Sequence, residues 1–279
     1  MIKIVTDSTA YLPQFIVRQN DLRVVPLCVH FGDKTYKEGV ELSNDEFYAR
    51  LKEAPVLPTT SQPSAGEFHQ VFSELVADGH EIVTLTISSR LSGTWNSAMA
   101  AKEMMPDAKI SIVDSLSTAA GLLLMVEAAV NARNAGASRE EIVQQVEDIK
   151  KKVQVFFVVD TLEYLAKGGR IGNAKAFLGT LLKVKPILFL KNGAIEPLEQ
   201  VRSKRKAQAR MVELVEEYMG GKGTGAHVAL VNALVPEETA VLAEELRERL
   251  GCPPPHITEL GPVIGTHTGP GVIGVGVYN

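Results

Sequence analysis

The sequence has 279 residues and an apolar fraction of 45%, enough to bury a core in one large or two ordinary domains. Its formal net charge of -4 disfavours broad binding to nucleic acid or to a membrane surface, because both need an excess of basic residues. Cys28 and Cys252 lie far apart and outside any metal-ligand spacing, which favours a reducing compartment. With an early polar N-terminus and no long apolar run, the sequence predicts a soluble, cytoplasmic protein.

The first half of the chain alternates between short apolar, β-rich runs and helix-forming segments. Strands are predicted at 2–6, 23–31, 81–87 and 109–113, a hairpin at 32–42, a surface loop at 53–63, and helices at 12–19, after Ser43, after Ser64, at 93–105 and at 117–135. This alternation predicts a mostly parallel sheet with helices on both faces. Ligands bind outside the carboxyl ends of such strands, so Asp7, residues 88–92 and Asp114 are expected on one rim.

A second α/β domain is expected to begin near residue 153, giving approximate domains of 1–152 and 153–279 between which segments can exchange. Capping boxes are predicted for Ser43 with Glu46, Ser64 with Glu67 and Ser138 with Glu141. The second half predicts a strand at 153–159, a short helix capped by Asp160, a helix at 173–183, a hairpin around Asn192 and Gly193, helices at 203–219 and 236–250, and strands at 227–233, near Ile257 and at 272–278.

Residues 88–98 are expected to lead from a buried strand straight into a helix, with Ser92 as its N-cap. Free amides, the hydroxyls of Ser92 and Thr94, and the positive end of the helix dipole suit an anion, and Gly93 allows close approach. No carboxylate occurs between positions 88 and 101. An ordinary helix cap explains this segment equally well by itself, but residues 58–64 and 261–271 share its small, hydroxyl-rich and acid-free character.

His267 lies between two threonines in the last of these segments and is expected to project from a tight loop. It is the histidine we favour as a ligand group, and a capping or turn role is the alternative. Metal binding is disfavoured, because no other ligand type lies at a suitable spacing. Ser92 with His267 also suggests an esterase-type hydrolase, although no G-x-S-x-G elbow is present.

Arg202, Lys204, Arg205, Lys206 and Arg210 form the most concentrated basic cluster of the sequence. Cations in a first helical turn oppose the helix dipole, which favours an anionic phosphate or an acidic protein surface as partner. A solvated basic face is equally compatible, and a regulatory interaction module is a further alternative. Residues 269–274 fit the G-x-G-x-x-G spacing, but no helix or acidic residue follows, and 221–225 lack the order of a P-loop, so nucleotide binding is disfavoured.

Taken together, these segments resemble the DegV family of bacterial fatty-acid-binding proteins. The matching motifs follow one another along nearly the whole chain: residues 4–8, 59–64, 88–98, 113–115, 160–165, 167–171, 185–188, 201–204 and 261–276.

The resemblance implies a two-domain α/β fold that holds one long-chain fatty acid between its domains. In members that serve as the binding subunit of fatty acid kinase, the acid is presented to a separate ATP-dependent kinase subunit and leaves as acyl phosphate for phospholipid synthesis. The chain is then a lipid-binding carrier without catalytic residues, cofactor or metal. By motif, the carboxylate contacts are Thr60, Ser92 and His267, helped by Ser61, Gly93 and Thr94, and the phosphate or kinase contacts are Arg170, Arg202 and Lys204.

Elementary energetics agree with such a ligand. A C16 or C18 chain buries about 14 to 16 methylenes, a gross gain of roughly 11 to 13 kcal/mol before entropy is subtracted. An unpaired buried carboxylate is costly, so hydroxyls, helix amides and His267 are expected to hold it. Candidate wall residues, which ordinary core packing explains equally well, are Leu122, Leu123, Leu124, Met125, Phe156, Phe177, Leu178 and Ile187.

Overall fold

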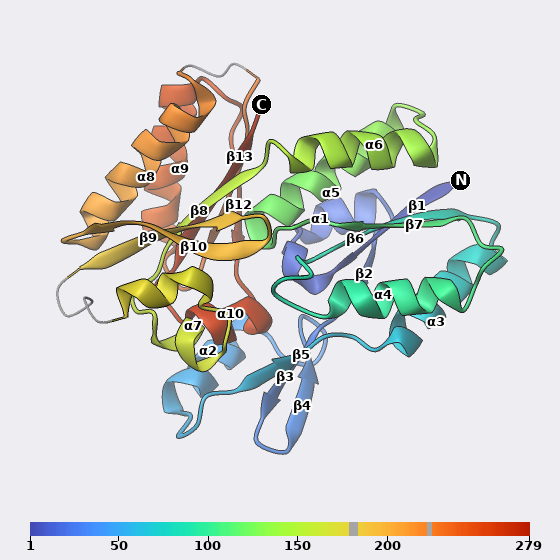
Figure 1. Ribbon diagram of the computed structural model, residues 1–279, viewed down its shortest axis with the longest axis horizontal. Helices are drawn as coiled ribbons and strands as arrows, with labels where there is room; N and C mark the ends of the chain where they lie inside the picture. Colours follow the sequence, from blue (N-terminus) through green and yellow to red (C-terminus); the bar gives the residue numbers. More distant parts are fainter. Residues whose placement is uncertain (179–183, 222–224) are drawn as a thin grey trace.

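The computed structural model describes residues 1–178, 184–221 and 225–279, which form a mixed α/β fold with three sheets (Figure 1). The strand orders are β2-β1-β6-β7, β10-β9-β8-β13-β11-β12 and β4-β3-β5. The strands are β1 Ile2–Asp7, β2 Arg23–Val25, β3 Cys28–Phe31, β4 Lys34–Lys37, β5 Thr59–Ser61, β6 Glu81–Thr86, β7 Ile110–Asp114, β8 Gln154–Val158, β9 Lys185–Lys191, β10 Ala194–Val201, β11 His227–Asn232, β12 His256–Glu259 and β13 Ile273–Tyr278.

Ten α-helices and two 3₁₀ helices connect these strands in the described ranges. They are η1 Ser8–Ala10, α1 Gln14–Gln19, α2 Asn44–Glu53, α3 Ala65–Ala77, α4 Thr94–Glu103, α5 Ala119–Asn134, α6 Arg139–Lys150, α7 Glu163–Lys167, η2 Gly172–Phe177, α8 Lys204–Met219, α9 Pro236–Leu250 and α10 Pro262–Thr268. In the part of the chain that the structure describes, no helix combines the length and apolarity needed to span a membrane.

The four-stranded sheet is wholly parallel, as the alternation of strands and helices predicts. Its two faces are covered by different helices, because neighbouring residues of a strand point in opposite directions. Val5 packs towards α3 and α4, whereas Ile4 packs towards α5 and α6. Because the strands are parallel, β1, β6 and β7 end at the same edge of the sheet. The prediction that Asp7, residues 88–92 and Asp114 lie on one rim is confirmed.

The six-stranded sheet is mostly antiparallel, with β11 and β12 as its parallel pair. α8 and α9 cover one of its faces (Figure 1). Against the other face lies α5, which also packs on the first sheet and is apolar almost all round. A side chain at Gly276 would come within 2.9 Å of the Ala120 backbone, so glycine is needed where β13 crosses α5.

Several local predictions are confirmed by hydrogen bonds. Complete capping boxes start α3 at Ser64 and α6 at Ser138. Asn192 and Gly193 both have positive φ, as the two-residue turn between β9 and β10 requires. Ser43 caps α2, but Glu46 does not complete the box, because its carboxylate bonds Arg50.

Other predicted elements were wrong in extent. The predicted strand at 23–31 divides at Pro26, so β2 joins the parallel sheet and β3 joins the small sheet. The loop predicted at 53–63 contains β5, which pairs with β3. Asp160 does not cap α7, which begins after Leu162 without a side-chain cap, because the Asp160 carboxylate pairs with Lys185 at 2.8 Å.

The helix predicted at 173–183 is a 3₁₀ helix over its first part, and residues 179–183 lie outside the described residues, as do 222–224 of the segment 221–225. The glycine-rich segment 261–271 is not a loop but contains the helix α10, which Pro262 opens and Gly269 ends. The domain boundary near residue 153 stays a prediction. The four-stranded sheet uses residues up to 114, and the six-stranded sheet begins at 154.

Candidate functional site

A largely apolar cavity lies among the carboxyl ends of the parallel strands, α10 and the inner face of the six-stranded sheet. The space among its walls is about 860 Å³ when the open solvent at its mouth is counted. The apolar lining comprises Leu27, Ile87, Leu91, Ala119, Val155, Phe157, Leu165, Leu190, Ile195, Val231, Leu260, Val263, Ile264, Val272 and Gly274. The polar lining comprises Thr60, Ser61, Gln62, Ser92, Thr118, Arg170, His267 and Thr268.

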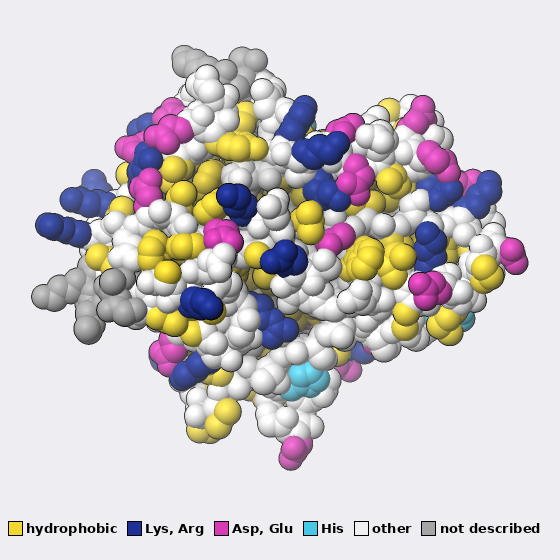
Figure 2. Space-filling view, viewed as in Figure 1, with side chains coloured by type: hydrophobic (Ala, Val, Ile, Leu, Met, Phe, Trp, Pro, Cys, Tyr) yellow, Lys and Arg dark blue, Asp and Glu magenta, His cyan; other side chains and the backbone are white. Residues whose placement is uncertain are grey.

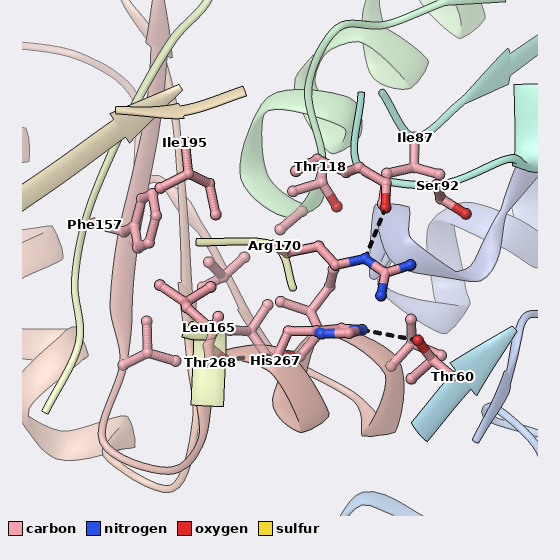
Figure 3. Close-up of a pocket in the computed structure, with 18 of the residues that line it drawn as sticks. Thr60, Ile87, Ser92, Thr118, Phe157, Leu165, Arg170, Ile195, His267 and Thr268 are labelled. Carbon is pink, nitrogen blue, oxygen red and sulfur yellow. Dashed lines mark hydrogen bonds between the residues drawn. The ribbon is translucent and has the colours of Figure 1, made fainter. Parts of the chain in front are cut away.

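Most of the labelled polar side chains lie towards one end of this cavity, whereas Thr268 lies beside Leu165 (Figure 3). Thr60, His267 and Arg170 lie close together there, whereas Phe157 and Ile195 lie at the far side of the view. Thr60 Oγ1 and His267 Nε2 are 2.8 Å apart and share a hydrogen bond. The cavity therefore has a polar end and an apolar body.

His267 is a buried, neutral imidazole. It is 8% exposed, and burial, with a further contribution from the charge of Arg170, lowers its pKa to about 4. Its Nδ1 has no hydrogen-bond partner among the described residues. A side chain at Gly168 would lie 2.2 Å from that nitrogen, so glycine is needed for the α7 loop to pass the ring.

Arg170 supplies positive charge at the polar end. Its Nε donates to the carbonyl oxygen of Leu91 at 3.2 Å, and one terminal nitrogen donates to that of Gly168 at 2.8 Å. No carboxylate pairs with this guanidinium in the described parts of the chain. Because the charge is held in place without a counter-ion, this end of the cavity suits an anion.

The segment after β6 differs in detail from its prediction. Gly93, not Ser92, is the N-cap of α4, and it forms no side-chain cap; Ser92 Oγ bonds Thr94 Oγ1 at 2.9 Å. The cap is shifted because the amides of Leu91 and Ser92 both close a turn on the Ser88 carbonyl.

The strand ends next to this segment carry two carboxylates. Asp114 accepts from the Ser89 amide at 3.1 Å, so the segment is acid-free in sequence but not in space. Asp7 is buried and accepts from the Ile87 amide at 2.6 Å, and burial raises its pKa to about 6. Both carboxylates hold the loop in shape, and neither lines the cavity.

The residues predicted to hold a carboxylate fall into two groups. Thr60, Ser61, Ser92 and His267 line the cavity, and Ser61 Oγ also bonds His30 Nε2. Gly93 and Thr94 lie behind this lining: Thr94 is fully buried, and a side chain at Gly93 would meet Gln62 at 2.8 Å. Their role in holding a ligand stays a prediction.

Of the three basic residues predicted for phosphate or partner contacts, Arg170 alone lines the cavity. Arg202 is exposed between β10 and α8, and Lys204 pairs with Glu238. Arg210 is neutralised by Glu199, Glu213 and Glu217. Figure 2 shows basic, acidic and apolar side chains interspersed over one face of the molecule, with no large field of one sign.

None of the predicted wall residues lines this cavity. Phe156 and Ile187 pack towards α8 and α9 on the outer face, while Phe157, next in sequence, faces the cavity. Leu122 and Met125 pack against the first sheet, Leu123 and Leu124 join the core between the sheets, Phe177 packs at the edge of that core, and Leu178 is 47% exposed. The cavity wall is apolar, as predicted, but the residues predicted to form it lie elsewhere in the fold.

Gln62 and Thr118 were not singled out from the sequence. Gln62 lies inside the hydroxyl-rich segment 58–64, which is a signal that could have found it. Thr118 precedes α5 without capping it, and its buried Oγ1 has no partner in the described residues.

The hydrolase alternative lacks its central contact. A nucleophilic serine needs a base within hydrogen-bond reach and a third group that orients the base. His267 Nε2 bonds Thr60 instead of Ser92, and its Nδ1 is without a partner in the described ranges. Those ranges also hold no group of three His, Cys, Asp or Glu side chains that could bind a metal ion.

Comparisons with known proteins agree with this geometry. The family model described as "Uncharacterised protein, DegV family" matches residues 1–279. Protein DegV of Bacillus subtilis is 39% identical over 279 residues, which cover 98% of each chain. A DegV-domain-containing protein of Halalkalibacterium halodurans is 40% identical over 279 residues, 99% of this chain and 98% of that one.

Solved structures are similar over the whole chain. A DegV-family protein of Thermus thermophilus, described as binding fatty acid, has a TM-score of 0.95 and 35% identity and covers 100% of this chain and 99% of its own. A stearic-acid-binding protein of Eubacterium ventriosum has a TM-score of 0.93 and 31% identity, with coverage of 100% and 98%. With the family model matched from end to end, the chain belongs to the DegV family.

Proposed function

We propose that this protein binds one long-chain fatty acid, with the carboxylate at the end formed by Thr60, His267 and Arg170 and the acyl chain along the apolar walls. The observation that carries the proposal is a largely apolar cavity with Thr60, His267 and Arg170 close together at one end. Relatives described as fatty-acid-binding, at 31% and 35% identity, support the same ligand class.

The two parts of the ligand have different roles in binding. Burying each methylene contributes roughly 0.8 kcal/mol, so the acyl chain supplies most of the affinity. A buried carboxylate needs donors, and Thr60 can provide one when His267 Nε2–H donates to its hydroxyl oxygen, leaving the hydroxyl hydrogen for the ligand. Arg170 adds the opposite charge. The polar end therefore selects an acid over a neutral lipid.

Thermal unfolding of delipidated protein with C14 to C20 fatty acids tests this proposal. A ligand at one hundred times its dissociation constant adds about 2.7 kcal/mol to the free energy of unfolding, so the melting temperature should rise by several degrees. Mass spectrometry of the protein as purified should also detect a fatty acid. If neither the shift nor a co-purified acid is found, the proposal is wrong.

We further propose that the protein is a cytoplasmic carrier that presents the bound acid to a separate ATP-dependent fatty acid kinase subunit, which forms acyl phosphate for phospholipid synthesis. The family resemblance supports this role. Thr60, Arg170 and His267 also border a second, outward-facing depression together with Lys167, so the head group is accessible from the surface. Arg170, Arg202 and Lys204, the last of which pairs with Glu238, are the basic residues that we propose for the phosphate or the partner.

Incubation with ATP and a fatty acid kinase subunit tests the carrier role. Acyl phosphate should form only when both proteins are present. His267→Ala should impair acyl-phosphate formation more strongly than it impairs folding, which the melting temperature measures. If loaded protein yields no acyl phosphate with any such kinase, the carrier role is wrong while fatty-acid binding still holds.

A further inference from the structure

The first turn of α10, the helix that carries His267, is held by side chains from the beginning of the chain. The Val263 amide donates to Glu38 Oε1 at 2.7 Å, and the Ile264 amide donates to the Tyr11 hydroxyl at 3.1 Å. Pro262 has no amide hydrogen to satisfy. The partners are 225 and 253 positions away in sequence, so this helix depends on long-range contacts for its start.

Glu38 is itself fixed from several sides. It is 4% exposed, and its carboxylate also accepts from Ser8 Oγ and, at 3.0 Å, from the Tyr11 hydroxyl. Its own amide donates to the Leu27 carbonyl at 2.9 Å. A side chain at Gly261 would lie 2.7 Å from Glu38 Oε1, so glycine is needed for α10 to approach this carboxylate. Burying an acid without hydrogen-bond partners is costly. The Glu38 carboxyl group is therefore expected to keep these partners and to remain ordered.

The same small sheet contacts α10 at both ends. Glu38 directly follows β4 and bonds the first turn of α10, whereas Thr60 lies on β5 and bonds His267 in the last turn. Val263 and His267 are four positions apart and share a face of the helix. Because both residues lie on one short helix, release of its first turn would displace His267 from Thr60. A binding site must hold its groups to within about 0.5 Å, so such a displacement would weaken the site.

We propose that Glu38, together with Tyr11, is a positioning residue for the head-group site: by holding the first turn of α10, it fixes His267 against Thr60 and so gives the cavity its preference for a carboxylate. This inference rests on the proposed function. The Glu38 side chain does not itself line the cavity, so it acts on the ligand through α10.

Two ligands of equal chain length isolate this effect. Hexadecanoate and hexadecan-1-ol bury nearly the same apolar surface, so the ratio of their dissociation constants measures the head-group site. The ratio is measured by displacement of a fluorescent fatty acid from delipidated protein. In Glu38→Ala the preference for the acid should fall tenfold or more and approach that of His267→Ala, and in Tyr11→Phe it should fall several-fold.

Glu38→Gln should restore most of the preference, because the amide oxygen still accepts from Val263 and the amide nitrogen can donate to Ser8 Oγ. The matched control is Glu127→Gln. Glu127 is a partly buried carboxyl on α5, 3.1 Å from His256 Nε2, and it does not line the cavity. This variant should keep the wild-type ratio.

A folded Glu38→Ala protein that keeps the wild-type ratio, or that loses affinity for both ligands equally, overturns the inference. If Glu38→Ala does not fold, Tyr11→Phe decides, and an unchanged ratio in that variant overturns it as well. Failure of the proposed function is distinguishable, because the wild-type protein would then bind neither ligand.

Discussion

Thr60 Oγ1 and His267 Nε2 lie 2.8 Å apart, although 207 positions separate the two residues in the chain. β5 of the small sheet supplies the hydroxyl, and α10 supplies the imidazole. Because burial lowers the pKa of His267 to about 4, the pair is neutral at neutral pH and acts through its hydrogen bonds rather than through charge.

Thr60→Val should weaken fatty-acid binding about tenfold, because it removes a hydroxyl of the polar end while nearly keeping the shape of the side chain; a lost hydrogen bond costs roughly 1 to 2 kcal/mol. Displacement titration measures the affinity, and thermal unfolding checks that the fold is kept. Thr59→Val is the matched control, since Thr59 is exposed on the same strand. Equal affinities in both variants would contradict the role of Thr60.

Arg170→Met should raise the pKa of His267 and weaken fatty-acid binding. The charge of Arg170 is the second cause of the low pKa of His267, and burial is the first. Without the charge, the pKa should therefore rise from about 4 but stay below 6.5. NMR titration of the imidazole signals gives the pKa, with Arg90→Met, an exposed arginine of the neighbouring loop, as control. A pKa that does not move would show that the guanidinium is not near the ring in solution.

The parallel sheet and its polar rim could be predicted because their signals are local. Each strand is a short apolar run followed at once by Asp7, Ser88 or Asp114, and such a pattern requires no knowledge of distant residues. The capping boxes of α3 and α6 are equally local, since both partners lie within one helical turn. The places of these strands and helix starts in the chain could therefore be predicted from the sequence.

α10 was missed because its stability comes from elsewhere in the chain. It is seven residues long, contains Gly265 and begins on contacts with Glu38 and Tyr11. Helices this short are unstable by themselves in water. His267 could thus be chosen from its sequence surroundings, but its position on a helix and its bond to Thr60 could not.

The cavity wall was missed for another physical reason. Both faces of β8 are buried, so Phe156 and Phe157 look alike in sequence although they point to opposite sides of the sheet. A strand buried on both faces lacks the polar alternation that would identify the cavity side. Which apolar residues meet a ligand depends on which face α5 and α10 cover.

Ile195→Phe should shift the chain-length preference towards shorter acids. Ile195 lies on β10 at the apolar side of the cavity (Figure 3), and a larger side chain there removes space from the acyl chain. The increase in melting temperature with a C18 acid should fall relative to that with a C14 acid. Leu198→Phe, on the same strand but packed towards α8, is the control. An unchanged order of chain lengths would place the acyl chain away from Ile195.

Glu38→Gln should remove a pH dependence from the stability of the protein. Burial, with a smaller effect of Asp7, raises the pKa of Glu38 from 4.5 to about 7, although the hydrogen bonds from Ser8, Val263 and Tyr11 act in the opposite direction. Between pH 4.5 and 7 the folded protein therefore keeps a proton that the unfolded chain has released. The free energy of unfolding then falls as the pH rises through this window, by on the order of 3 kcal/mol for a shift of this size.

Urea unfolding at pH 5 and pH 8 measures this difference between the wild-type protein and Glu38→Gln. Asp7 and His267 titrate in both proteins, so their contributions largely cancel in the comparison, apart from the smaller coupling between Asp7 and Glu38. Between pH 5 and pH 8, the free energy of unfolding of the wild-type protein should fall by roughly 1 to 3 kcal/mol more than that of the variant. Glu53→Gln, which changes an exposed carboxylate on α2, should follow the wild type. A difference that does not change with pH would mean that the Glu38 carboxylate is ionised throughout and that its hydrogen bonds outweigh the cost of burial.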